Sequence, residues 1–127
     1  MIQFIQEGGF GMLPVLVMGL LAIGVAGRYA WDVEPTRLKL VVALSAVLVA
    51  TMLHAMLTNV AAVLAYVQDP ARAPDAELTR TLITGLMEST RPGALGGALL
   101  SLALVLAAVG VSRAGVREMR ARAAEAR

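Results

Sequence analysis

The chain has 127 residues, of which 58% are hydrophobic and 16% are charged, and its formal net charge is +2. A water-soluble domain of this size carries about 25% charged residues, so the composition favours an integral membrane protein of one compact bundle. The absence of cysteine excludes a disulfide framework, a thiolate metal site and a cysteine nucleophile. The weak positive charge requires no nucleic-acid partner, because five of the eleven basic residues lie in the tail after Val111.

The first hydrophobic segment covers residues 10–30 and predicts a membrane-spanning helix. Residues 1–10 contain no Lys or Arg, whereas a secretory signal begins with a basic stretch, so we expect no cleavage here. Small residues recur in the span at intervals of three and four, which places them on one side of a helix. Another helix can approach closely on that side. The residues expected to pack in this way are Gly19, Ala22 and Ala26.

The second span, residues 40–67, is a run of 28 residues without Lys, Arg, Asp or Glu. A helix of that length measures about 42 Å, whereas the hydrocarbon core of a bilayer is about 30 Å thick. We therefore expect this helix to be tilted or to protrude at one end. Its few polar residues lie on or close to one arc of the helix, and we name them the polar seam: Thr51, His54, Thr58 and Asn59.

A polar seam inside a span is expected to face other protein or a water-filled space. Within it, His54 is the only titratable side chain deep in a span. Because imidazole can change charge near neutral pH, His54 could relay protons or gate a path. The simpler interpretation is a neutral histidine that forms hydrogen bonds across helices. No second histidine or nearby carboxylate suggests a metal site, and no nucleophile has a base, so we expect neither an enzyme nor a cofactor.

Between the second and third spans, Leu78, Leu82 and Leu86 recur at intervals of four, opposite charged and polar residues. This pattern predicts a short amphipathic helix at the membrane surface or leading into the third span. Pro92 then predicts a kink or break. Glu88 lies close to this boundary, three residues before Arg91, and could pair with it. Alternatively, Glu88 faces a pore entrance or a partner subunit.

The third span covers residues 93–111, and a basic tail, residues 112–127, follows. The tail could rest on anionic headgroups or form a solvated helix. In the span, small residues at intervals of four predict the strongest helix contact of the chain. These residues are Gly93, Gly97 and Ser101.

The distribution of basic residues predicts the orientation. If the N-terminus lies outside, eight of the eleven basic residues are cytoplasmic and three are external. The positive-inside rule therefore predicts a cytoplasmic C-terminus. The expected fold is all-α: one integral membrane domain with three transmembrane helices and a short amphipathic helix before the third.

Three segments resemble the MotA/TolQ/ExbB proton channel family. The segment from Gly8 to Leu16 reads GGFGMLPVL, similar to the family's entry into its first span. Residues 57–63 read LTNVAAV and are similar in outline to the end of its second span. Residues 85–90 read GLMEST and look like the opening of its third span, with Glu88 at the position of the family's functional carboxylate. The family's large cytoplasmic domain is replaced here by residues 32–39.

The resemblance implies a subunit of a proton-driven, energy-transducing complex in the bacterial inner membrane. It implies a homo-oligomer, a pentamer in the family, around a single-span ExbD/TolR-like partner that carries an intramembrane Asp. The polar seam would line the subunit interface or the proton path, and Glu88 would sit at its outer mouth. The alternative is a non-conducting structural or accessory subunit that packs against a larger complex.

Overall fold

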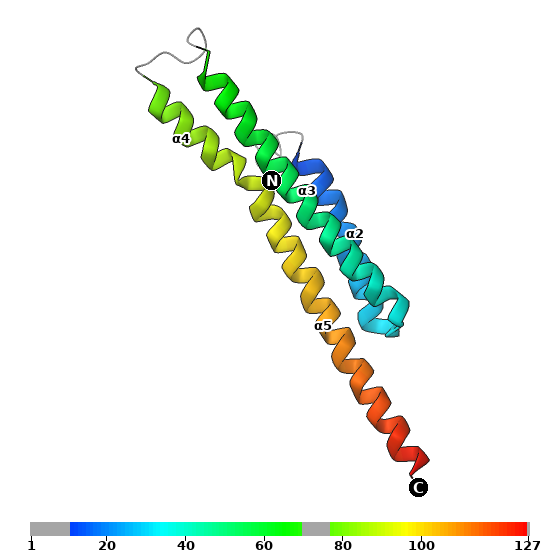
Figure 1. Ribbon diagram of the computed structural model, residues 1–127. Coiled ribbons are helices and arrows are strands. Elements are labelled where there is room, and N and C mark those ends of the chain that lie inside the picture. The colour runs from blue at the N-terminus through cyan, green and yellow to red at the C-terminus, as the bar shows by residue number, and fades with distance from the viewer. Residues whose placement is uncertain (1–10, 70–76, 127) are drawn as a thin grey trace.

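A computed structural model describes residues 11–69 and 77–126, and nearly all of these residues are helical (Figure 1). The elements are α2 (Met12–Asp32), α3 (Pro35–Val67), α4 (Leu78–Ser89) and α5 (Arg91–Glu125). The described ranges contain no strand, so the predicted all-α class is confirmed. Three predictions concern residues outside the described ranges. They are the Gly8–Gly9 start of the family-like motif, the absence of cleavage near the N-terminus, and the external position of Arg72.

Three helices are long and apolar enough to cross a membrane: Met12–Asp32, Pro35–Val67 and Leu78–Glu125. At about 1.5 Å per residue they measure about 32, 50 and 72 Å, so each can cross a hydrocarbon core about 30 Å thick. Large apolar side chains cover their outer surfaces, including Leu57 at 68% exposure and Val105 at 61%. A water-soluble monomer rarely exposes apolar patches of this extent. The surface is therefore that expected of a protein surrounded by lipid.

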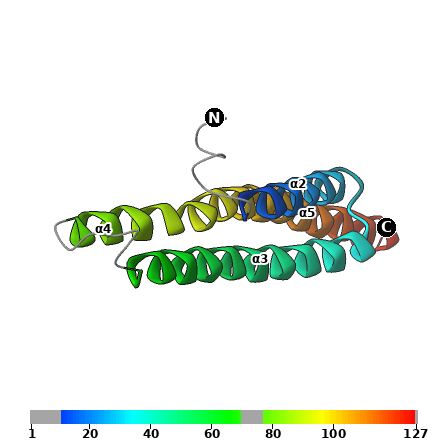
Figure 2. The same cartoon turned by 90° about the horizontal axis from the view of Figure 1, so that it is seen from above.

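The three long helices run alternately up and down. Val33 and Glu34 alone connect α2 to α3, which runs back along it, and α4 with α5 then runs in the direction of α2 (Figure 1). In the view turned by 90°, α2 and α5 lie against each other and α3 lies beside this pair (Figure 2). We call the end of the bundle at the α2–α3 turn the hairpin end.

Small residues allow α2 and α5 to pack closely. A Cβ atom added to Gly19 would lie 2.8 Å from Leu99 Cβ, and one added to Gly110 would lie 2.5 Å from the Tyr29 ring. Such distances are shorter than a van der Waals contact, so the two helices approach only because these positions carry no side chain. The other small buried residues of this contact are Ala22, Ala26, Ala103 and Ala107.

The face of α5 that contacts α2 differs from the predicted ladder of Gly93, Gly97 and Ser101. Ser101 is exposed, and a Cβ added to Gly97 would meet nothing within 4 Å. Gly93 instead faces Met56 of α3. The face that packs on α2 is turned about one residue from the ladder and carries Gly96 rather than Gly97. The three predicted residues therefore do not form one common helix contact in this subunit.

The predicted separate surface helix before the third span is not confirmed, because residues 78–125 form one bent helix. Only Thr90 separates α4 from α5, and its backbone remains helical with φ −83° and ψ −13°. Pro92 lacks an N–H group and perturbs the helix, but the Ala94 amide still donates to the Thr90 carbonyl at 3.1 Å. Of the kink and the break that Pro92 allowed in the sequence analysis, the structure shows the kink.

Helix α3 packs through residues seven apart, Val41, Leu48 and Ala55, and this spacing keeps one face of α3 against its neighbours. A Cβ added to Gly11, just before α2, would touch Ala55, so the last twelve residues of α3 extend beyond the start of α2. Beside this extension lies α4, with Gly85 against Val63.

Candidate functional site

The polar seam lies mostly on the outer face of α3. His54 and Thr58 are exposed, whereas Thr51 and Asn59 are half-buried. On the same helix, Leu48 and Ala55 are buried against α2 and α5, and at about 100° per residue they point between Thr51 and Asn59. His54 and Thr58 therefore point out of the subunit, whereas Thr51 and Asn59 lie at the two edges of the buried face of α3.

The hydroxyl groups of the polar seam are satisfied within α3. Thr51 Oγ1 donates to the Val47 carbonyl oxygen at 2.8 Å, and Thr58 Oγ1 donates to the His54 carbonyl oxygen at 2.8 Å. Threonine in a helix commonly bonds to the carbonyl one turn earlier, and such a hydroxyl needs no second helix. Asn59 is engaged in an interaction of its own. The imidazole of His54 makes no hydrogen bond within residues 11–69 and 77–126.

Small side chains accompany His54 along α3 and form a shallow stripe that the sequence analysis did not single out. Its members follow one another at intervals of four and are all exposed: Ala46, Ala50, His54, Thr58 and Ala62. The spacing of four is visible in the sequence. It does not distinguish an exposed stripe from a buried face, because small residues on the buried face of α2 recur at similar intervals. Small exposed residues at this spacing let a second helix approach the backbone of α3.

A cavity of about 500 Å³ lies between the extension of α3 and α4. We call it the α3–α4 cavity. Its charged lining comes from Glu77, which precedes α4, and from Arg80 and Glu88 of α4, and Tyr66 lines it from α3. Glu88 is half-buried and forms no ion pair within the described ranges, while Arg91 is engaged elsewhere. The suggested Glu88–Arg91 pair is therefore not present in residues 11–69 and 77–126, and Glu88 instead lines the α3–α4 cavity.

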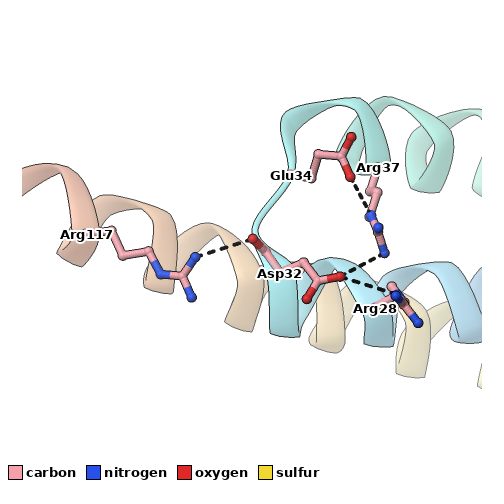
Figure 3. Close-up of polar contacts among 5 residues, drawn as sticks. All are labelled: Arg28, Asp32, Glu34, Arg37 and Arg117. Atoms are coloured by element: carbon pink, nitrogen blue, oxygen red, sulfur yellow. Dashed lines mark hydrogen bonds and ion pairs between the residues drawn. The ribbon is translucent and has the colours of Figure 1, made fainter.

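At the other end of the bundle, charged residues tie the three long helices together (Figure 3). Asp32 accepts from Arg28 at 3.3 Å and from Arg37 at 3.1 Å, and Arg37 also binds Glu34 at 2.8 Å. From α5, Arg117 donates to the Asp32 carbonyl oxygen at 3.3 Å. Nothing local in the sequence of residues 32–39 reveals that the basic tail of α5 reaches this segment.

The last turn of α2 shows why this cluster matters for the fold. Its terminal carbonyls have no partner within the helix, and the helix dipole concentrates negative charge there. Arg113 donates to the Ala30 carbonyl oxygen at 3.1 Å, and so caps this turn from α5. Val33 then adopts a left-handed conformation with φ 56°, which is rare for a β-branched residue, and its amide donates to Tyr29. The cationic caps and the strained turn together hold α2, α3 and α5 in register.

Comparison of the chain with protein-family models, with curated proteins and with solved structures found no match. The resemblance to the MotA/TolQ/ExbB group therefore remains a prediction from the three motifs. Two structural features bear on function independently of that resemblance. They are the exposed His54 and Thr58 of the polar seam and the α3–α4 cavity with its carboxylates.

Proposed function

We propose that this protein is a homo-oligomeric membrane subunit of a proton-driven, energy-transducing complex like those of the MotA/TolQ/ExbB group. The observation that carries the proposal is His54, an exposed imidazole without a hydrogen bond in the described ranges, in the middle of a long apolar helix. In a lone subunit this side chain would face lipid. The proposal assigns the outer face of α3 to contact with another subunit.

The energetic argument is that lipid is a poor environment for an imidazole. A polar group placed in an apolar medium without a hydrogen bond costs roughly 2–7 kcal/mol. A second copy of the chain can supply the missing hydrogen bond, and the alanines flanking His54 allow its helix to approach. Polar residues within spans face protein or water for this reason. Assembly through α3 thus removes a penalty that a monomer would bear.

The chain itself lacks a carboxylate within its three predicted spans, since residues 10–30, 40–67 and 93–111 contain no Asp or Glu. A proton-driven cycle needs such a group to change its charge. We therefore propose a single-span ExbD/TolR-like partner with an intramembrane Asp, with Glu88 and the α3–α4 cavity at one end of the path. The hairpin end, which carries most of the basic residues, faces the cytoplasm, and the membrane is the bacterial inner membrane.

A non-conducting accessory subunit is the second candidate. It is favoured by the hydroxyls of Thr51 and Thr58, which are already bonded to their own helix and need not hold water. In that case the outer face of α3 would pack against a larger complex, and His54 would only bind across the interface. The two candidates share the membrane fold and differ in whether His54 takes part in proton movement.

Crosslinking tests the assembly, because the chain contains no cysteine. We expect Ala50→Cys, one turn from His54 on the exposed stripe, to form disulfide-linked dimers in native membranes. Val105→Cys, exposed on α5, is the matched control and should give far fewer. The mass of the detergent-solubilised particle should be a multiple of the 13.3 kDa chain. A monomeric mass together with equal crosslinking at both positions would exclude the homo-oligomer.

Proton flux separates the two candidates. His54→Leu and Thr58→Val keep the side-chain size roughly constant and remove the polar groups. Both variants should be reconstituted with the co-purifying partner in vesicles that contain a pH-sensitive dye. If the protein conducts protons, flux falls while the oligomer mass stays unchanged. If flux and coupled activity match those of the wild type, the protein is an accessory subunit.

A further inference from the structure

A second cavity, of about 320 Å³, lies between α2 and α3 near the hairpin end. Its apolar lining comes from Gly24, Val25 and Leu40, and Arg28 and Arg37 supply its charged lining. We call it the α2–α3 groove. None of the functional roles proposed above uses this groove. It lies near the start of α3, whereas the α3–α4 cavity lies near the end of α3.

The groove is open because α2 has no side chain at Gly24. A Cβ atom added there would meet nothing within 4 Å. Gly24 lies one turn before Arg28, within the uncharged part of α2, and Leu40 begins the uncharged run of α3. The apolar walls therefore lie at the depth of acyl chains, and the two guanidinium groups lie at the depth of headgroups.

Arg28 and Arg37 retain donors for a ligand. Both bind the same Asp32 oxygen, and Arg37 also binds Glu34 (Figure 3). A guanidinium has five N–H groups. The ion pairs of Arg28 and Arg37 engage Nε of Arg28 and Nε and Nη1 of Arg37, which leaves further N–H groups on each side chain. Asp32 thus holds the two guanidinium groups close together without saturating them.

The same end of the molecule has an excess of positive charge. Arg28 and Arg37 are balanced by Asp32 and Glu34, and on this side of the bundle Lys39 and four arginines of α5 outnumber Glu118 and Glu125. Planar guanidinium groups bind phosphate through paired hydrogen bonds, and basic residues near an anionic leaflet attract its lipids. The charge therefore suits an anionic phosphate, and the apolar wall suits a hydrocarbon chain.

We propose that the α2–α3 groove binds one anionic phospholipid from the leaflet at the hairpin end. Its phosphate binds Arg28 and Arg37, and one acyl chain lies along Gly24, Val25 and Leu40. A free phosphate ion would leave the apolar wall uncovered, whereas a zwitterionic lipid would bring a second cation next to the two arginines. The bound lipid would fill the space between α2 and α3 where the helices leave a gap.

Trp31 provides the readout. It is the only tryptophan of the chain, it lies three residues after Arg28, and its side chain is 75% exposed. In vesicles of phosphatidylglycerol and phosphatidylcholine, brominating the chains of one lipid at a time reports which of them contacts this residue. We expect phosphatidylglycerol to be preferred roughly tenfold at the groove. In Arg28→Gln/Arg37→Gln the preference should fall to the level expected from bulk composition.

Gly24→Leu tests the groove without changing any charge. Its side chain would enter the open space, displace the acyl chain and reduce the preference several-fold. Gly97→Leu is the matched control, since a Cβ there also meets nothing within 4 Å, and it should leave the preference unchanged. Native mass spectrometry of the detergent-solubilised oligomer should find one phosphatidylglycerol retained per subunit in the wild type and in Gly97→Leu.

Two results would overturn the proposal. In the first, wild type and Arg28→Gln/Arg37→Gln show the same lipid preference. In the second, the arginine variant loses the preference but Gly24→Leu keeps it, which would mean general attraction to the surface. Circular dichroism and oligomer mass must match the wild type for each variant that is compared. Because the groove is remote from His54, crosslinking through α3 is expected to persist in all of them.

Discussion

Replacing Gly110 with alanine tests the close contact between α2 and α5. The added Cβ would lie 2.5 Å from Cδ1 and Cε1 of Tyr29 and 3.2 Å from Cα of Ala30. Carbon atoms pack best at about 3.5–4.0 Å, so the helices would have to separate by roughly 1 Å. Tyr29 is only 3% exposed, and Ala30 presents backbone, so neither neighbour can easily move aside.

The magnitude follows from two opposing effects. Glycine to alanine in a helix is stabilising by about 0.5–1 kcal/mol, because the unfolded chain loses freedom. Overpacking of a well-packed contact costs about 1–3 kcal/mol. Gly97→Ala, on the same helix with open space around it, shows the first effect alone. We therefore expect Gly110→Ala to be less stable than Gly97→Ala by about 1–3 kcal/mol.

The assay is unfolding by increasing mole fraction of sodium dodecyl sulfate in mixed micelles, followed by circular dichroism and Trp31 fluorescence. The free energies of the two variants are compared at the same detergent composition, with the wild type between them. Equal stability of Gly110→Ala and Gly97→Ala would refute the packing of α2 against α5. A wild type less stable than both variants would lead to the same conclusion.

Three further predictions concern other parts of the bundle. Leu48 is fully buried, and Leu48→Ala should destabilise the protein by about 2 kcal/mol. This is the lower end of the range of about 2–5 kcal/mol for water-soluble proteins, because lipid is as apolar as the core of the bundle. Leu57→Ala, at an exposed position, should be nearly neutral in the same detergent titration. Asp32→Asn removes two ion pairs of a half-exposed carboxylate, so it should lower the free energy of unfolding by no more than about 1 kcal/mol. When stability is measured at two ionic strengths, this difference should be smaller in high salt. Pro92→Ala restores a backbone N–H and should straighten the bent helix, moving α4 away from the end of α3; spin-label distances between these two helices would be unchanged if the proline does not cause the bend.

The polar seam illustrates what periodicity can and cannot predict. Helical geometry placed Thr51, His54 and Thr58 on one arc, and the structure agrees that they share a side of α3. Periodicity does not predict whether this side of α3 packs against other helices of the same chain. In α3 the buried face carries Leu48 and Ala55, roughly 100–120° from His54, so His54 is exposed while Thr51, which is nearer that face, is half-buried.

The small-residue ladders show the same limit in another form. Gly19, Ala22 and Ala26 lie in the α2–α5 contact, whereas Gly97 and Ser101 lie outside it. Both sets have the spacing of a contact face. Which set is used depends on the rotation of each helix about its axis, and a rotation of one residue exchanges Gly96 for Gly97.

The sequence by itself determined that the chain forms three long apolar helices, because long uncharged runs must satisfy their backbone hydrogen bonds internally and only a helix does so within one segment. Only the tertiary structure decided which faces meet, that the helix continues through Pro92, and that Arg113 and Arg117 cap the end of α2 from more than eighty residues away. These features depend on side-chain shape across helices and on contacts distant in the chain. Local hydrophobicity and spacing carry no information about either.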